Sequence, residues 1–184
     1  MAAVMARVTL RHATLDDVPT LKRWDEEPHV ISVTTDDPDA DNAFKGIVWE
    51  DEIAAASDAS RYWIAELDAR PIGAMQIIDP HLEPTHYWGE IAPNLRALDI
   101  WIGETADLGK GYGETMMRLA IEMCFAESAV TGIVIDPLAS NTRAHTFYQR
   151  LGFRPVDRRL FNDEDDCLVH ELTRADWRAR NSGA

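Results

Sequence analysis

The chain has little cysteine, no long apolar run and few basic residues, and each shortage excludes a class of protein. Two cysteines occur among 184 residues, Cys124 and Cys167, and they lie far apart. They indicate a reducing compartment and form no cluster with metal-ligand spacing. No stretch approaches the roughly 18 consecutive apolar residues of a membrane-spanning helix. The opening residues, MAAVMARVTL, are too interrupted by Arg7 to be a signal peptide. We therefore expect a cytoplasmic protein with neither a membrane partner nor a metal.

Basic residues are scarce because 18 Lys and Arg stand against 32 Asp and Glu, which gives a net charge of −14. A surface of this sign repels nucleic acid phosphates, so nucleic acids are excluded as partners. Two interpretations of the charge stay open. It serves solubility alone, or it steers a cationic molecule toward the protein. The acidic residues cluster at 24–27, 36–41 and 162–166.

What the chain does contain is the pattern of one folded domain over residues 1–184. Its hydrophobic fraction is 46% and its charged fraction 27%, which are ordinary values for a globular protein. The periodicities predict a mixed α/β (α+β) fold with a mostly antiparallel sheet flanked by helices. Pro28 and the 36–41 run mark a loop, and Ser140 is the expected N-cap of the last helix. Strands are predicted at 7–13, 61–67, 71–79, 83–91, 95–104, 131–137, 154–162 and 167–173, and helices at 14–27, 40–57, after the glycine run to 125, and at 140–153.

Three glycines at alternate positions, Gly109, Gly111 and Gly113, precede the longest predicted helix. Bare backbone at a helix N-terminus suits an anion, because N–H groups and the helix dipole attract negative charge. A Walker A loop is excluded, since Glu114 follows where Lys is required, and the G-x-G-x-G spacing disfavours a Rossmann loop. The pyrophosphate loop of an acyl-coenzyme A transferase and a plain tight turn remain. We assign the apolar stripe of the following helix to the core: Met116, Met117, Leu119, Ala120, Met123 and Cys124.

A second motif, N-x-R-A-x-x-x-Y-x-x-x-G-F, runs from Asn141 to Phe153 and includes Tyr148. Together with the glycine run it resembles the GNAT superfamily of acetyl-CoA-dependent N-acyltransferases. The resemblance implies the GNAT fold, with the glycine loop on the pyrophosphate of acetyl-CoA and the second motif along the pantetheine arm. One departure is Leu108, which stands where the family usually has Gln or Arg. The cofactor-binding positions implied are Ile100, Trp101, Ile102, Leu108, Gly109, Lys110, Gly111, Tyr112, Gly113, Asn141 and Ala144.

From about residue 61 to residue 153 the chain also looks like the aminoglycoside 6'-N-acetyltransferase group. The resemblance implies that Asp99, in ALDIWIG, is a general base. It places Asp136, in the DP pair, at the amine site, and Trp88 against a sugar ring. The implied substrate-binding set is Trp88, Glu90, Asp99, Asp136 and Asp165, the last from the acidic C-terminal loop that also holds Asp166.

The chemistry that these residues offer is direct transfer of an acetyl group to an amine. A substrate ammonium must first lose a proton, and the Asp99 carboxylate is the candidate base. Backbone at Trp101 and Ile102 supplies an oxyanion donor if the strand is splayed there. The Tyr148 phenol is the candidate acid for the departing thiolate. Neither a metal nor a covalent enzyme intermediate is required.

Structural alternatives stay open for each residue. Asp99 could bond nearby backbone, Asp136 could open a turn, and Tyr148 could be core packing. Asn141 could be only a helix-start residue. His145, amid polar neighbours in a predicted helix, is expected to be exposed and without a catalytic role.

The predicted activity is acetylation of a primary amine on a small polycationic acceptor, best specified as the 6'-amine of an aminoglycoside. Two rivals are another amine acceptor (a protein N-terminus, a polyamine or a siderophore precursor) and a non-catalytic acyl-CoA-binding sensor. The acidic segment 25–41 is the expected acceptor wall. The sequence allows a monomer or a homodimer.

Overall fold

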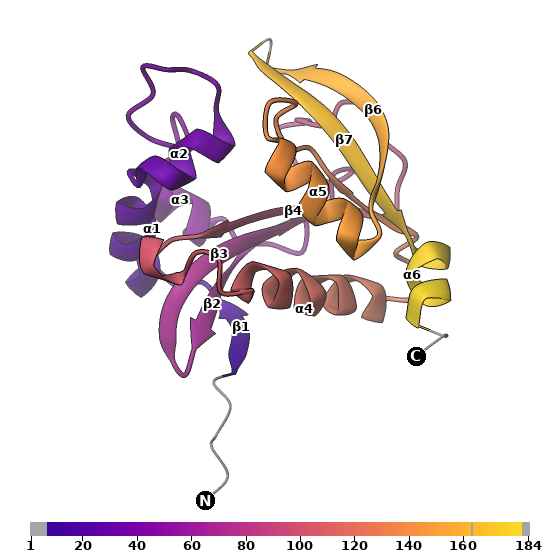
Figure 1. Ribbon diagram of the computed structural model, residues 1–184, viewed down its shortest axis with the longest axis horizontal. Coiled ribbons are helices and arrows are strands. Elements are labelled where there is room, and N and C mark those ends of the chain that lie inside the picture. The colour runs from indigo at the N-terminus through magenta and orange to yellow at the C-terminus, as the bar shows by residue number, and fades with distance from the viewer. Residues whose placement is uncertain (1–6, 163, 182–184) are drawn as a thin grey trace, which may run out of the picture.

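Seven strands form one sheet with helices packed on both faces, in a computed structural model that describes residues 7–162 and 164–181 (Figure 1). Residues 1–6, which carry most of the stretch judged not to be a signal peptide, lie outside this part, as does residue 163 of the acidic 162–166 run. The strands are β1 (Val8–His12), β2 (Ser60–Leu67), β3 (Arg70–Ile78), β4 (Leu95–Ile102), β5 (Gly132–Ile135), β6 (Arg154–Phe161) and β7 (Asp165–Thr173). The helices are α1 (Val18–Asp25), α2 (Pro28–Thr34), α3 (Trp49–Ala54), α4 (Tyr112–Ala126), α5 (Thr142–Leu151) and α6 (Arg174–Asn181), with 3₁₀ turns at Leu15–Asp17 and Thr105–Asp107.

The sheet order is β1-β2-β3-β4-β5-β7-β6, and every neighbouring pair is antiparallel except β4 with β5. The predicted mixed, mostly antiparallel sheet is therefore confirmed. One face packs against α4 and α5 through the larger core cluster, and α1 to α3 cover the other face through a cluster rich in tryptophan. In α4 the predicted apolar stripe is largely buried, with Met116 and Met117 both at 0% exposure.

The parallel pair β4–β5 separates part-way along its length. Registered partners run only from Leu95 opposite Gly132 to Ala97 opposite Val134. Because β4 continues to Ile102, its second half has no strand partner on the β5 side. We call the space between the diverging strands the β4–β5 gap.

The backbone of β4 presents N–H groups to this gap. The Gly103 N–H donates to the Ile72 carbonyl at 3.0 Å, so the Ile102 carbonyl in the same peptide points away from β3. Because successive residues of a strand alternate in direction, the N–H groups of Ile100 and Ile102 face the gap. The Trp101 N–H faces β3, so of the two backbone positions expected to supply one oxyanion donor, Ile102 is the one whose N–H faces the gap. Contact of either with a cofactor stays a prediction.

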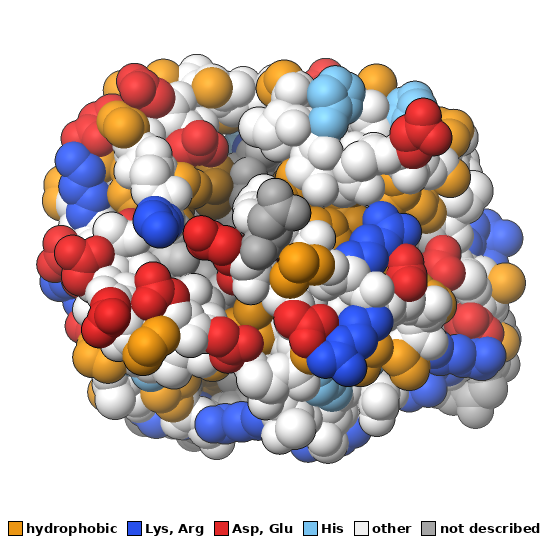
Figure 2. All heavy atoms as spheres, turned by 90° about the horizontal axis from the view of Figure 1, so that it is seen from above, with side chains coloured by type: hydrophobic (Ala, Val, Ile, Leu, Met, Phe, Trp, Pro, Cys, Tyr) orange, Lys and Arg blue, Asp and Glu red, His pale blue; other side chains and the backbone are white. Residues whose placement is uncertain are grey.

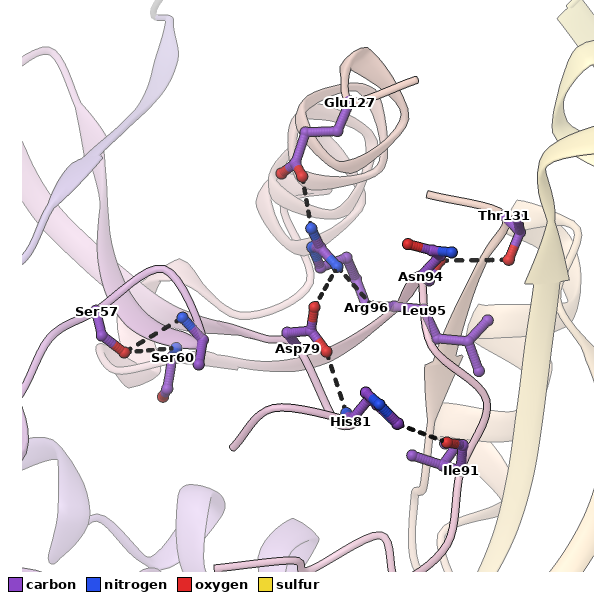
Figure 3. A network of polar contacts seen from close by, with 11 residues as sticks. Ser57, Ser60, Asp79, His81, Ile91, Asn94, Leu95, Arg96, Glu127 and Thr131 are labelled. Carbon is purple, nitrogen blue, oxygen red and sulfur yellow. Dashed lines mark hydrogen bonds and ion pairs between the residues drawn. The ribbon is translucent and has the colours of Figure 1, made fainter. Parts of the chain in front are cut away.

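A polar clamp fixes the far end of β4, away from the gap. Arg96 lies between Asp79 and Glu127, and its guanidinium pairs with both carboxylates (Figure 3). The nitrogen–oxygen distance to Asp79 is 2.9 Å, and only 14% of the Arg96 side chain is exposed. The clamp joins β4 to the residues that follow β3 and α4, so this end of β4 is held in place.

Residues 83–91 form a loop, and the prediction of a strand there is wrong. The Glu83 carboxylate accepts hydrogen bonds from the backbone N–H groups of Thr85 and Tyr87 at 2.8 and 2.6 Å. His86 has a positive φ of 52°, which an extended strand does not permit. A side chain that bonds nearby backbone N–H groups offers them an alternative to a strand ladder.

The segment between α1 and β2 also differs from the prediction. The helix predicted at 40–57 is restricted to α3, and Pro28 begins α2 instead of marking a loop. Proline suits a first helical position, where its missing N–H is not needed. The carboxylate of Asp25 accepts hydrogen bonds from the N–H groups of Ala43 and Phe44 at 2.9 and 2.8 Å. This buried side chain holds the segment before α3 as a loop.

The C-terminal helix α6 was not predicted, because its sequence is strongly polar and none of its residues is buried. Within the described residues, no helix is both long and apolar enough to span a bilayer.

Candidate active site

A cavity of about 1110 Å³ opens beside the β4–β5 gap. Its walls come from the loop after α2, the 83–88 loop, β4, the residues after β5, and the tip of the β6–β7 hairpin. The lining is strongly acidic, and Lys45 is the one basic side chain among its described residues. Seen from above, acidic side chains gather on the face that carries the loop after α2 and the hairpin tip (Figure 2). The lining carboxylates are Asp37, Asp39, Asp41, Glu52, Glu83, Asp99, Asp136, Glu164 and Asp165.

Asp99 and Asp136 form the inner end of this acidic lining. Asp99 comes from the gap-facing half of β4, and Asp136 follows the last residue of β5. Burial, and then the neighbouring Asp136 charge, raise the pKa of Asp99 from 3.8 to about 7. Burial also raises the pKa of Asp136. The pair therefore holds a proton more readily than exposed carboxylates do, and it attracts a cation.

Tyr87 was missed by sequence reasoning, although it contacts this pair. Its phenol donates a hydrogen bond to Asp136 Oδ2 at 2.7 Å, and its ring stacks on Phe161 with centroids 4.6 Å apart. The hydrogen bond favours the charged form of Asp136, against the effect of burial. Because Tyr87 lies in a segment predicted to be a strand, its sequence position carried no signal of this role.

Tyr148 lies on α5 with 9% of its surface exposed, and it lines the cavity. Burial, followed by the charges of Asp99 and Asp136, raises the pKa of its phenol. The phenol therefore keeps its proton at neutral pH. It is also part of the core cluster, so packing and a role in the cavity coexist here.

The glycine loop leads into α4 as predicted. Gly109 and Gly111 have positive φ angles of 73° and 81°, and Gly111 is the N-cap of α4. No atom lies within 4 Å of the position that a Cβ would occupy at Gly109, Gly111 or Gly113. The loop is therefore an open cradle of backbone at the N-terminus of a 15-residue helix, and these residues fit an anionic group such as a pyrophosphate.

Three side chains at the loop have different surroundings. The Lys110 ammonium lies 3.5 Å from Asp107 Oδ1, and the same carboxylate receives both terminal nitrogens of Arg70. Leu108 is 37% exposed. Tyr112 begins α4 and packs partly against the core.

Asn141, and not the predicted Ser140, is the N-cap of α5. Its Oδ1 accepts a hydrogen bond from the Ala144 N–H at 3.0 Å. The Ser140 hydroxyl instead donates to Asp36 Oδ1 at 2.7 Å and joins the loop after α2 to the start of α5. Asn141 thus has a structural role, and its contact with a cofactor stays a prediction, as does that of Ala144.

The structure separates two predicted substrate residues. Trp88 is 4% exposed and packs against Phe161 with ring centroids 5.3 Å apart, yet it lines the cavity. Glu90 is exposed and lies outside the described lining of the cavity. Among the described residues the structure therefore brings Trp88, and not Glu90, to the site.

The β6–β7 hairpin contributes Asp165 to the cavity. Burial, Glu164 and Asp36 raise its pKa. The neighbouring Asp166 forms an ion pair with Arg158 on the outside of the hairpin. Among the described residues of this acidic run, Glu164 and Asp165 line the cavity and are available to a cation.

His145 was expected to be exposed, but the structure places it half-buried. Its ring lies against His170, which is 0% exposed, and the two rings hydrogen bond at 3.0 Å. Among the described residues, no group of His, Cys, Asp and Glu side chains has an arrangement that could hold a metal ion.

The sequence model of the acetyltransferase (GNAT) domain matches residues 13–161. The chain belongs to the GNAT acetyltransferase family. Within this family it is 30% identical over 149 residues to the aminoglycoside N(6')-acetyltransferase type 1 of Klebsiella pneumoniae, covering 79% of this chain and 73% of that protein. A kanamycin resistance protein of Rhizobium radiobacter is 37% identical over 73 residues, which are 39% of this chain and 68% of that protein.

Solved structures of the family share the fold. The aminoglycoside acetyltransferase AAC(6')-Ib in complex with coenzyme A and kanamycin superposes with a TM-score of 0.79 at 27% identity, covering 95% of this chain and 99% of that one. Spermidine N-acetyltransferase from Vibrio cholerae has a TM-score of 0.69 at 16% identity, covering 93% of this chain and 98% of that one, a likeness of fold alone.

Proposed function

We propose that the chain transfers the acetyl group of acetyl-CoA to a primary amine of a small polycationic acceptor, specifically the 6'-amine of an aminoglycoside. The observation that carries the proposal is the position of Asp99. Its carboxylate lies where an acidic cavity meets the β4–β5 gap. The similarity to aminoglycoside N(6')-acetyltransferases supports the choice of acceptor. We place the activity in the cytoplasm, as a monomer or a homodimer.

The residues present suit acetyl-CoA. The open backbone cradle at Gly109 and Gly111 would hold its pyrophosphate, because backbone N–H groups at a helix start attract anions and no side chain stands in the way. The N–H groups of Ile100 and Ile102, which face the gap, are the available donors for its extended arm and carbonyl oxygen. When bound, acetyl-CoA would supply the activated acyl group.

Two side chains of this chain would move the protons. Asp99, with a pKa of about 7, is matched to removing a proton from an ammonium near neutral pH. Tyr148, which stays protonated because burial raises its pKa, would donate its proton to the leaving sulfur. Asp136, whose carboxylate accepts a hydrogen bond from the Tyr87 phenol, would lie beside the amine as a second acidic group.

The acidic lining favours an acceptor with several positive charges. Nine carboxylates and one lysine among the described lining residues leave a large excess of negative charge. The volume of about 1110 Å³ exceeds what a single small amine fills. Asp165 at the hairpin would bind an ammonium distant from the one that reacts.

The test is release of coenzyme A thiol by the purified protein with acetyl-CoA and a kanamycin- or tobramycin-type acceptor. The matched control is the same acceptor with a hydroxyl in place of the 6'-amine, for which we expect no release. Transfer to a polyamine or a peptide N-terminus, but not to aminoglycosides, would overturn the aminoglycoside as the acceptor and identify the other amine in its place. Tight acetyl-CoA binding without transfer to any amine would support the sensor alternative.

A further inference from the structure

Two histidines, His170 buried and His145 half-buried, form a hydrogen-bonded chain beside Tyr148. His170 Nε2 on β7 lies 3.0 Å from His145 Nδ1 on α5, and the rings stack with centroids 5.2 Å apart. The other nitrogen of His145, Nε2, lies 3.3 Å from the carbonyl oxygen of Ala139. These hydrogen bonds therefore join β7, α5 and the connection that leads from β5 into α5.

The Ala139 carbonyl, at the end of this series of hydrogen bonds, decides which ring nitrogens carry protons. Since the Ala139 carbonyl can only accept, His145 carries its proton on Nε2, and in the neutral pair its Nδ1 accepts from His170 Nε2–H. Burial, and then the neighbouring His145, lower the pKa of His170 to about 4. His170 is therefore neutral at physiological pH.

The pair carries an unsatisfied atom that ordinary packing does not require. His170 Nδ1 is buried and has no hydrogen-bond partner among the described residues. Leaving a buried polar atom unpaired costs about 1–3 kcal/mol. An apolar pair of similar size would fill the same space without this cost. The unpaired atom therefore indicates that the two histidines do more than pack, because their hydrogen bonds are directional and can fix an orientation.

The orientation that these hydrogen bonds can fix is that of the helix face that carries Tyr148. His145 and Tyr148 are three residues apart on α5, so they are neighbours on one face of the helix. The rings of Tyr148 and His170 lie 6.4 Å apart between centroids. The hydrogen bonds to Ala139 and His170 fix the rotation and axial position of this helix face against β7.

We propose that His145 and His170 are positioning residues, whose hydrogen-bonded chain to the Ala139 carbonyl holds the phenol of Tyr148 in place for acetyl transfer. The proposal rests on the proposed function, because it needs Tyr148 to act on the leaving group. Neither histidine lines the cavity among its described residues, so neither touches an acceptor.

The experiment compares His145→Leu, His170→Leu and the double variant by kcat, by KM for the acceptor, and by calorimetric Kd for coenzyme A. We expect each single variant to lower kcat about tenfold or more, since a small misplacement of a reacting group is costly. KM and Kd should change by less than about threefold. The double variant should lose no more than the worse single variant, because the pair acts as one unit.

Rescue and control variants separate positioning from structural support. His170→Gln keeps an N–H donor toward His145 and should recover most of the lost kcat. His12→Gln, on edge strand β1 and outside the described lining, should leave kcat unchanged. Melting temperatures identify a variant that fails to fold. If His170→Leu fails to fold, the test is the comparison of kcat between His145→Leu and His170→Gln.

The outcomes separate this proposal from the proposed function. No transfer by the unaltered protein to any amine overturns both. Transfer by the unaltered protein, with kcat undiminished in His145→Leu and His170→Leu, overturns only the positioning role. Equal losses of kcat, coenzyme A binding and melting temperature, without rescue by His170→Gln, show a structural role and also overturn it.

Discussion

At the scale of single residues, Asp99 owes its chemistry to burial and to one neighbour, Asp136. β4 places it beside an acidic cavity, and Asp136 adds a second carboxylate close by. Burial and like charge both disfavour the ionised form, so the proton is held to a higher pH than on an exposed aspartate. A carboxylate of this kind exchanges a proton near neutrality, which is where an acetyltransferase base must work.

Asp99→Asn should lower turnover by about a hundredfold or more while coenzyme A binding stays unchanged, because amide nitrogen and oxygen cannot take up the ammonium proton. In the unaltered protein, kcat/KM should fall as the pH drops through about 7, where Asp99 becomes protonated. The measurement is thiol release from pH 5.5 to 9. Loss of coenzyme A affinity in this variant would indicate a structural acid instead.

The same substitution should change how stability depends on pH. The folded-state pKa of Asp99, about 7, lies above the ordinary value of 3.8. The folded protein therefore binds the proton more tightly, and its stability declines as pH rises from about 4 through 7. Asp99→Asn has no such proton, so its melting temperature relative to the unaltered protein should rise across this window. A constant difference from pH 4 to 8 would contradict the raised pKa.

At the scale of elements, the glycine loop and the separation of β4 from β5 would together form the proposed coenzyme A site. Neither feature is made by side chains. The loop offers N–H groups at the start of α4, and the gap offers those of Ile100 and Ile102. Alternation along β4 then sends Asp99 into the cavity, while Ile100 and Ile102 pack on the other face against the core that contains α4.

Gly111→Ala tests the loop as a cradle, with Gly89→Ala as its matched control. Both glycines have positive φ, 81° and 62°, and both have open space where a Cβ would lie. Each substitution should therefore lower the free energy of unfolding by about 1–2 kcal/mol. Only Gly111→Ala should also weaken coenzyme A binding, measured by calorimetry. Equal affinity in the two variants would mean that the loop is merely a tight turn.

For the whole molecule, the net charge of −14 and the acidic lining act in the same direction on a cationic acceptor. Attraction over distances beyond contact is screened by salt, since the Debye length falls from about 10 Å at 0.1 M to about 3 Å at 1 M. We expect this charge to repel nucleic acids and to concentrate a polyamine-like sugar at the cavity.

Raising the salt concentration from about 0.1 to about 1 M should increase KM for an aminoglycoside by about tenfold, with a smaller change in kcat. A monoamine acceptor is the control, and its KM should rise much less because fewer charges are screened. Initial rates over a salt series provide the measurement. Equal salt dependence for both acceptors would show that the acidic surface serves solubility alone.

Local patterns were enough to predict the strands that carry buried residues, the helix after the glycine run and the two motifs. They failed where a distant or polar partner decides the backbone. Glu83 turns a strand-like segment into a loop through its bonds to nearby N–H groups. Asp25 holds Ala43 and Phe44 out of a helix from 18 residues away or more. Such bonds leave no periodic trace in the sequence.

By itself the sequence determined the mixed fold, the glycine loop, the acid in β4 and the charge, because each follows from local spacing or composition. Only the tertiary structure decided that Asp99 lies near Asp136, that Tyr87 holds Asp136, and that His145 meets His170. The hydrogen bond between Tyr87 and Asp136 joins residues 49 positions apart, and that between His145 and His170 joins residues 25 positions apart. The two carboxylate contacts exist because strand order and the divergence of β4 from β5 bring distant segments to one cavity. The histidine contact exists because α5 packs beside β7.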